Sequence, residues 1–423
     1  MRLLSTAAAT EATGPVTAAS RVFDPFQADY LREPYPVLKQ LREDEPVFFS
    51  PELKSWVVSR HETIKGILRD TKRYSALVVS DPLTPMCPHA RKMIQESGFD
   101  VPPMLVNNDP PSHTRYRKFF AEPLQRPRLL SLEPFVRETV KRYVDRMEAG
   151  PRPVDIVAAL TWDVPALVLF KLLGVPSQDV AQVKEWADSR VVLTWGKPSE
   201  EEQIRLSAGA IDYYNYSQAL VQRKLVEPGD DYLTDLVHAR DGDDARMSLH
   251  EIGGIAFNLL FAGHETTSSA AVNMFSAILQ RPGLWQRICA GEQPLQPVVE
   301  EALRFDPPIQ AWRRQVKEDV VLDGISIPAG SRILMMFASA NRDPAVFEQP
   351  DDFEPGRKNL PQHLAFGQGL HFCMGAPLAR LELEIMLEEV SRRFPAMAVV
   401  PGQVPQYVPN TSFRALRKLL VTW

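Results

Sequence analysis

The residues that point most directly to chemistry lie around Cys373. Residues 366–375 read FGQGLHFCMG, so three glycines surround one cysteine directly before a predicted helix. Glycines permit a tight loop that a flat ligand can approach closely. The free amide groups and the dipole at a helix N-terminus favour a thiolate over a thiol. We therefore predict that Cys373 is a nucleophile or a metal ligand.

Other interpretations of Cys373 explain the pattern less well. A lone cysteine is usually a small buried hydrophobic residue, but such a residue does not need a glycine-rich loop. A zinc site would need further cysteine or histidine ligands, and only His371 lies at a suitable spacing. A cysteine nucleophile of the papain type would lack the local signature of that family.

Two further pairs of residues have a spacing that suits ligand binding or proton transfer. His113 and Arg117 are four residues apart in a predicted helix, so they share a face that suits a single carboxylate; a solvated basic face is the alternative. Glu265 and Thr266 lie in mid-helix, where neither propensity nor packing requires them. Ala262, one turn earlier, leaves room for a small ligand, and a threonine hydroxyl bonded to a carbonyl can loosen the helix and admit water.

Together, these segments resemble the cytochrome P-450 superfamily over residues 24–423. FGQGLHFCMG, followed by Leu378-Ala379-Arg380, resembles its haem-binding loop. Four other segments follow in the family's order. HTRYR at 113–117 resembles its H-x-x-x-R, and AGHETT at 262–267 resembles its oxygen-activating helix. EALR at 301–304 resembles its E-x-x-R, and FEPGR at 353–357 resembles its downstream arginine segment.

The resemblance implies a mainly α fold with a smaller β portion, in which a long central helix lies over haem b. Cys373 would ligate the haem iron, and thiolate ligation favours O–O cleavage. Arg314 is expected to bind a propionate, with Arg313 as its rival. The residues expected at the haem are His113, Arg117, Ala262, Arg314, Phe366, Gly367, His371, Cys373, Gly375 and Ala379.

Further roles follow from the same resemblance. Glu265 and Thr266 would supply protons for the cleavage of dioxygen, while His264 and Thr267 are expected to be structural. Glu301, Arg304 and Arg357 would form a buried ion network around the cysteine loop. A surface pair at the 301–304 spacing would contribute little, but an isolated pair would not be followed by a matching arginine.

The implied function is a monooxygenase that inserts one oxygen atom from dioxygen into a small hydrophobic substrate, by hydroxylation or dealkylation. Electrons from NAD(P)H would arrive through a flavin/iron–sulfur reductase or a ferredoxin outside these 423 residues, which hold no glycine-rich nucleotide fingerprint. The chain also resembles the haem domains of self-sufficient, reductase-fused enzymes. One alternative is a peroxide-driven peroxygenase, although such enzymes usually lose the acid–alcohol pair that Glu265 and Thr266 would form here. The other is a non-enzymatic haem sensor or electron carrier.

Composition restricts the partners and the location. With 53 acidic and 48 basic side chains the formal charge is −5, which gives no reason to expect nucleic acid or an anionic membrane as a partner. The longest charge-free apolar stretch, 252–263, is shorter than the ~20 residues of a membrane span. Three cysteines without C-x-x-C spacing fit a reducing compartment, so we expect a soluble, cytoplasmic protein.

The elements that must position these residues are mostly helices. We expect a disordered leader over 1–20 and one domain over 21–423. A hairpin is predicted over 46–59, then a helix capped by Ser59 and Glu62, an irregular stretch over 74–108, and a helix capped by Asp109. Helices are predicted at 130–147, 157–173, 177–195, 204–226, 248–280, 295–304 and 376–393, with a hairpin turn at Asp323-Gly324, a strand from 332 and a strand-rich tail. Substrate contacts are expected from 74–108, 177–213, 258–262, 309–312 and 409–413.

Overall fold

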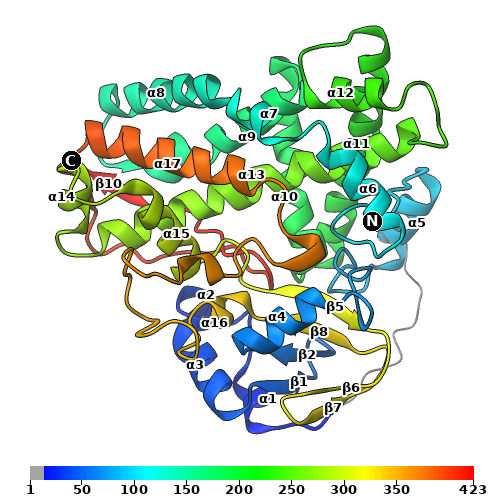
Figure 1. Ribbon diagram of the computed structural model, residues 1–423, viewed down its shortest axis with the longest axis horizontal. Coiled ribbons are helices and arrows are strands. Elements are labelled where there is room, and N and C mark those ends of the chain that lie inside the picture. Colours follow the sequence, from blue (N-terminus) through cyan, green and yellow to red (C-terminus); the bar gives the residue numbers. More distant parts are fainter. Residues whose placement is uncertain (1–13) are drawn as a thin grey trace.

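The computed structural model describes residues 14–423, apart from the side chains at positions 126, 188 and 189. A large helical region adjoins a smaller region that holds most of the strands (Figure 1). This arrangement confirms the predicted mainly α fold with a smaller β portion. Positions 1–13 of the expected leader lie outside the described residues, and helix α1 (Ala18–Val22) begins within the remainder of it.

The largest sheet has five strands in the order β1-β2-β8-β5-β3. Strands β2 and β8 run parallel, and the other neighbours are antiparallel. Val47 and Phe49 of β1 belong to one hydrophobic cluster and Phe48 to another, so alternate side chains face opposite sides of the sheet. The hairpin predicted over 46–59 is therefore confirmed. The strands are β1 (Val47–Ser50), β2 (Ser55–Val58), β3 (Tyr74–Ser75), β5 (Trp312–Val316) and β8 (Arg332–Met335).

Two smaller sheets complete the β structure. Strands β6 (Val320–Leu322) and β7 (Ile325–Ile327) pair around Asp323 and Gly324, whose φ angles are 45° and 83°. Two consecutive positive φ angles are typical of the turn that the Asp-Gly pair predicts. The second sheet, in the C-terminal region, consists of β4 (Val154–Asp155), β10 (Leu420–Thr422) and β9 (Ala398–Val399).

Helix α13 (Leu249–Leu279) is the central element of the helical region (Figure 1). Ser248 and Glu251 form the predicted capping box at its start, where each side chain accepts a hydrogen bond from the other's backbone. Its side chains are buried nearly all round because it packs against helices on several sides. These helices are α9 (Asp163–Leu173), α11 (Glu200–Val226), α15 (Leu295–Phe305) and α17 (Ala376–Arg393).

The remaining helices surround this centre or cover the five-stranded sheet. They are α2 (Ala28–Arg32), α3 (Tyr35–Asp44), α4 (His61–Arg69), α5 (Pro88–Glu96), α6 (Ser112–Ala121), α7 (Arg126–Leu130), α8 (Glu133–Ala149), α10 (Val180–Trp195), α12 (Tyr232–Ala239), α14 (Leu284–Cys289) and α16 (Phe337–Ala340). Short helical turns lie at Val157–Thr161, Ser177–Asp179, Leu360–Gln362 and Gly369–His371.

Three local predictions were wrong, and in the first two a tertiary contact replaces the expected local bond. Ser59 does not cap α4, since its hydroxyl donates to the Pro46 carbonyl across the hairpin at 3.0 Å. Asp109 does not cap α6, since its carboxylate accepts the Ala76 amide at 2.8 Å. The stretch 74–108 is not wholly irregular, because it contains β3 and α5.

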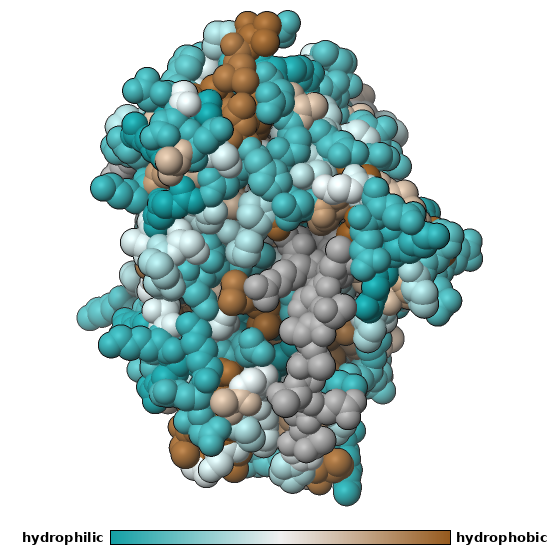
Figure 2. Space-filling model, turned by 90° about the vertical axis from the view of Figure 1, so that its right-hand side faces the viewer, coloured by the Kyte–Doolittle hydropathy of each residue, from teal (hydrophilic) through white to brown (hydrophobic). Residues whose placement is uncertain are grey.

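The face shown in Figure 2 is mostly hydrophilic in its described part, and hydrophobic side chains gather there only in small groups. None of the helices over residues 14–423 combines the length and the apolar character that a membrane span requires.

Candidate active site

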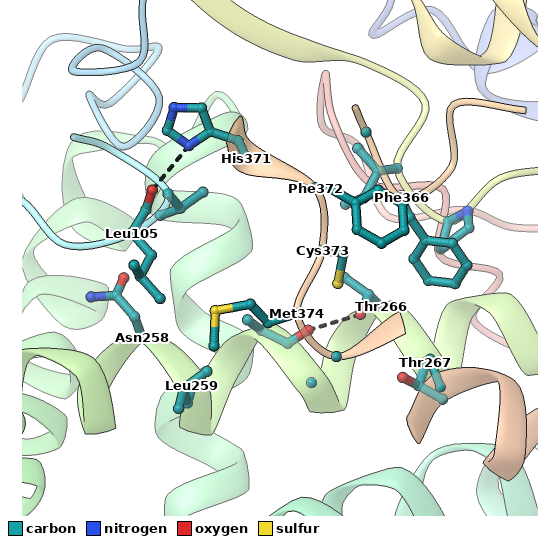
Figure 3. A pocket seen from close by; sticks show the side chains of 18 of the residues that line it. Leu105, Asn258, Leu259, Thr266, Thr267, Phe366, His371, Phe372, Cys373 and Met374 are labelled. Carbon is teal, nitrogen blue, oxygen red and sulfur yellow. Dashed lines mark hydrogen bonds between the residues drawn. The ribbon is translucent and has the colours of Figure 1, made fainter. Parts of the chain in front are cut away.

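A cavity of about 330 Å³ lies between α13 and the loop that precedes α17 (Figure 3). Its wall is predominantly apolar. Nine of the ten residues predicted at the haem border it: Arg117, Ala262, Arg314, Phe366, Gly367, His371, Cys373, Gly375 and Ala379. The tenth residue, His113, packs against His371 of the cavity wall, and their ring centroids are 4.4 Å apart.

Cys373 lies in the glycine-rich loop and presents its thiol to the cavity. Its amide donates to the Phe366 carbonyl at 3.0 Å, which closes the loop. Gly369 has φ +69°, and a Cβ there would lie 2.8 Å from the Leu68 carbonyl oxygen, so only glycine fits. The loop is therefore held tightly against α4.

Burial raises the pKa of the Cys373 thiol, although the amides of Gly375 and Ala376 and the charge of Arg117 act in the opposite direction. The amides at the helix N-terminus therefore favour the thiolate as predicted, but in the protein alone burial outweighs them. A bound metal ion would deprotonate the thiol.

Four nitrogen-bearing side chains lie beside Cys373, namely those of His113, Arg117, Arg314 and His371. Both ring nitrogens of His113 are buried without a hydrogen-bond partner. Burial, reinforced by the charge of Arg117, lowers the pKa of His113 to about 4. Neither Arg117 nor Arg314 forms an ion pair with a carboxylate of the described residues. With His371 they fit the propionate groups of a haem, because such groups would satisfy these unpaired donors.

The structure separates Arg314 from its neighbour Arg313. Arg314 borders the cavity. Arg313 instead donates to the backbone carbonyls of Asp81 and Thr194, at 2.9 and 3.3 Å. This difference favours Arg314 as the residue at the cofactor, as predicted, and leaves Arg313 a structural role.

On α13, Thr266 borders the cavity and its hydroxyl donates to the Ala262 carbonyl at 2.8 Å (Figure 3). The side chain of Glu265 is buried and does not border the cavity, since a helix turns by about 100° per residue. His264 packs against Trp162, with ring centroids 5.0 Å apart, which agrees with its expected structural role. Thr267, also expected to be structural, borders the cavity.

A carboxyl group at the cavity was missed by the sequence reasoning. Glu382 of α17 is 2% exposed and borders the cavity. Burial raises its pKa well above the usual value, which favours the neutral form of the carboxyl group. The available signal was its spacing from Leu378 and Ile385, which places an acidic residue on the apolar face of a predicted helix.

Glu301, Arg304 and Arg357 come together as predicted. Two nitrogens of Arg304 donate to the two oxygens of Glu301 at 2.6 and 2.7 Å, and Arg357 donates to the same carboxylate at 3.2 Å. The side chains of Glu301 and Arg304 are 0% exposed. Arg304 also donates to the carbonyls of Asn341, Pro350 and Asp352, so it holds the segment before the cysteine loop.

The adjacent residue, Glu300, holds a second network that the sequence analysis did not identify. Its carboxylate accepts hydrogen bonds from Arg380 at 2.5 and 3.0 Å and contacts His363 at 3.1 Å. The Arg380 guanidinium lies 4.5 Å from the ring centroid of Phe366 in the cysteine loop. Helix α15 therefore supports the loop through two neighbouring glutamates.

Four neighbouring aromatic side chains form one part of the cavity wall. Trp195 stacks on Trp312 and Phe261, with centroids 5.7 and 5.9 Å apart, and meets Phe413 edge-on at 4.9 Å. Each of the five segments expected to contact substrate contributes to the lining of the cavity. Within 177–213, however, Arg190 and Trp195 are the only described side chains that do so.

Comparisons with known proteins agree with this geometry. Residues 294–418 match the family described as Cytochrome P450. The chain is 35% identical to cytochrome P450 monooxygenase PikC of Streptomyces venezuelae, over 93% of this chain and 92% of that protein. It is 33% identical to mycinamicin IV hydroxylase/epoxidase of Micromonospora griseorubida, over 91% and 94%.

Solved structures are similar over nearly the whole chain. Cytochrome P450 CREJ in complex with (4-ethylphenyl) dihydrogen phosphate has a TM-score of 0.92 at 34% identity and covers 96% of this chain and 100% of its own. An intact type IV self-sufficient cytochrome P450 monooxygenase also has a TM-score of 0.92 at 34% identity, but this chain spans only 54% of that longer protein.

These similarities confirm the predicted family, enzyme class, cofactor and partners. Enzymes of this kind bind haem b through a cysteine thiolate and act on organic substrates with dioxygen, using NAD(P)H electrons from a reductase or ferredoxin. The chain belongs to the cytochrome P450 family of haem-thiolate monooxygenases.

Proposed function

We propose that Cys373 is the thiolate ligand of the haem iron in this monooxygenase. Its thiol is the only one of the three cysteine thiols that borders the cavity. Cys87 lies at the start of α5 and donates its amide to Gln203, and Cys289 ends α14. His113, Arg117, Arg314 and His371 would hold the propionates, while Ala262, Phe366, Gly367, Gly375 and Ala379 would contact the ring.

When bound, a cysteine-ligated haem supplies the electron density that favours cleavage of the O–O bond. Thr266 then holds water beside the cavity, because its hydroxyl accepts one hydrogen bond while it donates to Ala262. Glu265 supplies protons through the loosened turn of α13 rather than from the cavity itself. Glu382 lies at the cavity wall, and burial raises its pKa and favours its neutral form there.

The substrate proposed from the lining is a small, apolar organic molecule that is hydroxylated or dealkylated. The aromatic part of the cavity wall, formed by Trp195, Phe261, Trp312 and Phe413, supports this class of substrate. The electron donor is a flavin/iron–sulfur reductase or a ferredoxin, and the similarity to a longer self-sufficient enzyme supports the former. A cytoplasmic location is supported by the three free cysteines. A single domain over 21–423 is supported by one hydrophobic cluster that reaches from Met86 to Val421.

The observation that carries the proposal is the position of the Cys373 thiol at the cavity, opposite Thr266. The test compares the ferrous–CO spectra of Cys373→Ser and Cys87→Ser. Cys373→Ser should lose the thiolate-type band and product formation, whereas Cys87→Ser should keep both. A thiolate band that persists in Cys373→Ser would refute the assignment.

A further inference from the structure

Arg190 of α10 is a buried cation that the haem site does not account for. It is 5% exposed and borders the cavity. Its Nη2 donates to Oδ1 of Asn258 at 2.8 Å and its Nη1 to the Phe257 carbonyl at 3.4 Å, while Nε has no partner. No carboxylate among the described side chains forms an ion pair with it. Burial lowers its pKa to about 10, so it remains charged at neutral pH.

The guanidinium is held in one orientation. It lies 4.8 and 4.9 Å from the ring centroids of Phe257 and Phe261. Asn258, which points toward the cavity in Figure 3, is itself fixed because its Nδ2 donates to the Gly254 carbonyl at 2.8 Å. A buried charge is costly unless it is paired, and a rigidly positioned arginine is well suited to bind an oxyanion through two parallel bonds.

Arg190 lies on α10, whereas the cations beside Cys373 lie on α6, on β5 and in the cysteine loop. Its partner Asn258 precedes Thr266 by eight residues, which is about 12 Å along α13. The aromatic residues Trp195, Phe261, Trp312 and Phe413 border the same cavity. A single elongated molecule would place its anionic group at Arg190 and its apolar body against these rings.

We propose that Arg190, oriented by Asn258, binds an oxyanion of the substrate, so that the enzyme takes an aromatic or similarly apolar organic acid with a carboxylate or phosphate group. Oxidation then falls at the end of the molecule away from the acid. This inference rests on the proposed function of the cavity as the substrate site.

The test is calorimetric titration of the haem-loaded protein with three ligands of similar shape: 4-ethylbenzoate, 4-ethylphenyl phosphate and the neutral 4-ethylbenzamide. The wild type should bind at least one of the anions about tenfold more tightly than the amide. The anion that binds more tightly identifies the head group. Because calorimetry does not depend on turnover, the result is separate from the test of Cys373 as ligand.

Arg190→Met should lower affinity for the preferred anion by about tenfold or more and change affinity for the amide by less than about threefold. Arg190→Lys should recover part of the loss, and Asn258→Ala should show a smaller loss confined to the anions. Arg205→Gln, which removes an exposed positive charge from α11, should change neither affinity. Equal losses for anion and amide would mean that Arg190 only supports the fold and would overturn the proposal. Should Arg190→Met not fold, equal wild-type affinities for anions and amide would overturn it.

Discussion

The Thr266 hydroxyl donates a 2.8 Å hydrogen bond to the Ala262 carbonyl, one turn earlier in α13, where the helix borders the cavity. The side chain of Thr266 therefore faces the reaction space while its hydroxyl bonds to a backbone carbonyl of the same helix, an arrangement that can bend a helix. Glu265, the next residue back, faces the protein interior. The acid and the alcohol thus lie on different sides of the same turn, and their variants should behave differently.

Thr266→Ala should still bind haem and substrate, because the hydroxyl is not a ligand and its loss leaves only a small cavity. Without the hydroxyl, water at this turn is not ordered for proton transfer. Product per reducing equivalent should fall severalfold while hydrogen peroxide rises. Both are counted in one reaction with dioxygen. Full coupling in Thr266→Ala would show that the substrate or another residue supplies the proton.

Glu265→Gln should slow turnover by about tenfold or more while product per electron changes little, because the buried carboxylate limits the proton supply. Glu382→Gln is the matched control at the other carboxyl. Burial raises the pKa of Glu382 and so favours the neutral acid, which glutamine resembles, so this variant should retain most of the turnover. A larger effect of Glu382→Gln than of Glu265→Gln would make Glu382 the main donor.

Arg117→Ala should weaken haem retention by about 1.5–3 kcal/mol, since one propionate would lose a charge-assisted bond. Folding should persist, because His113, Arg314 and His371 remain. The measurement is the rate of haem transfer to an apo-acceptor. Arg115→Ala on the same helix, whose guanidinium pairs with Glu251, serves as the control and should leave that rate unchanged. Equal rates in wild type and Arg117→Ala would support the alternative of a basic helix face.

Arg304→Ala should destabilise the fold by about 3–5 kcal/mol, because it leaves the carboxylate of Glu301 buried with only Arg357 as a charged partner. Arg137→Ala, which breaks the partly exposed pair with Glu133, should cost less than about 1 kcal/mol. Urea denaturation of both variants gives the comparison. A loss in Arg304→Ala as small as that in Arg137→Ala would contradict a structural role for the network.

Glu300 gives the stability a predictable pH dependence. Burial would raise its pKa, but hydrogen bonds from His363 and Arg380 lower it to about 2, below the ordinary 4.5. A carboxyl whose pKa is lower in the folded state stabilises the protein above about pH 4.5, and this contribution is lost as the pH falls toward 2. Between pH 7 and pH 4 the wild type should lose about 1 kcal/mol more than Glu300→Gln, measured by urea denaturation. Identical losses would mean that Glu300 is not ion-paired in solution.

Several parts of the molecule were predictable because their determinants are local in the chain. Ser248 and Glu251 set the start of α13 through a box that closes within one turn. Asp323 and Gly324 set their hairpin through two φ angles. The glycines around Cys373 and the spacing of Glu301 with Arg304 predicted the type of site, because each of these signals lies in a few adjacent residues.

The tertiary structure decided what depends on residues far apart in the sequence. Because of tertiary packing, Ser59 bonds across a hairpin instead of capping a helix. Arg314 borders the cavity and Arg313 does not, because the two side chains lie on different sides of β5. It also placed Glu382 and Arg190 at the cavity. Burial determines the charge and the usefulness of such groups, and burial is set by the packing of distant helices, which no local pattern of residues specifies.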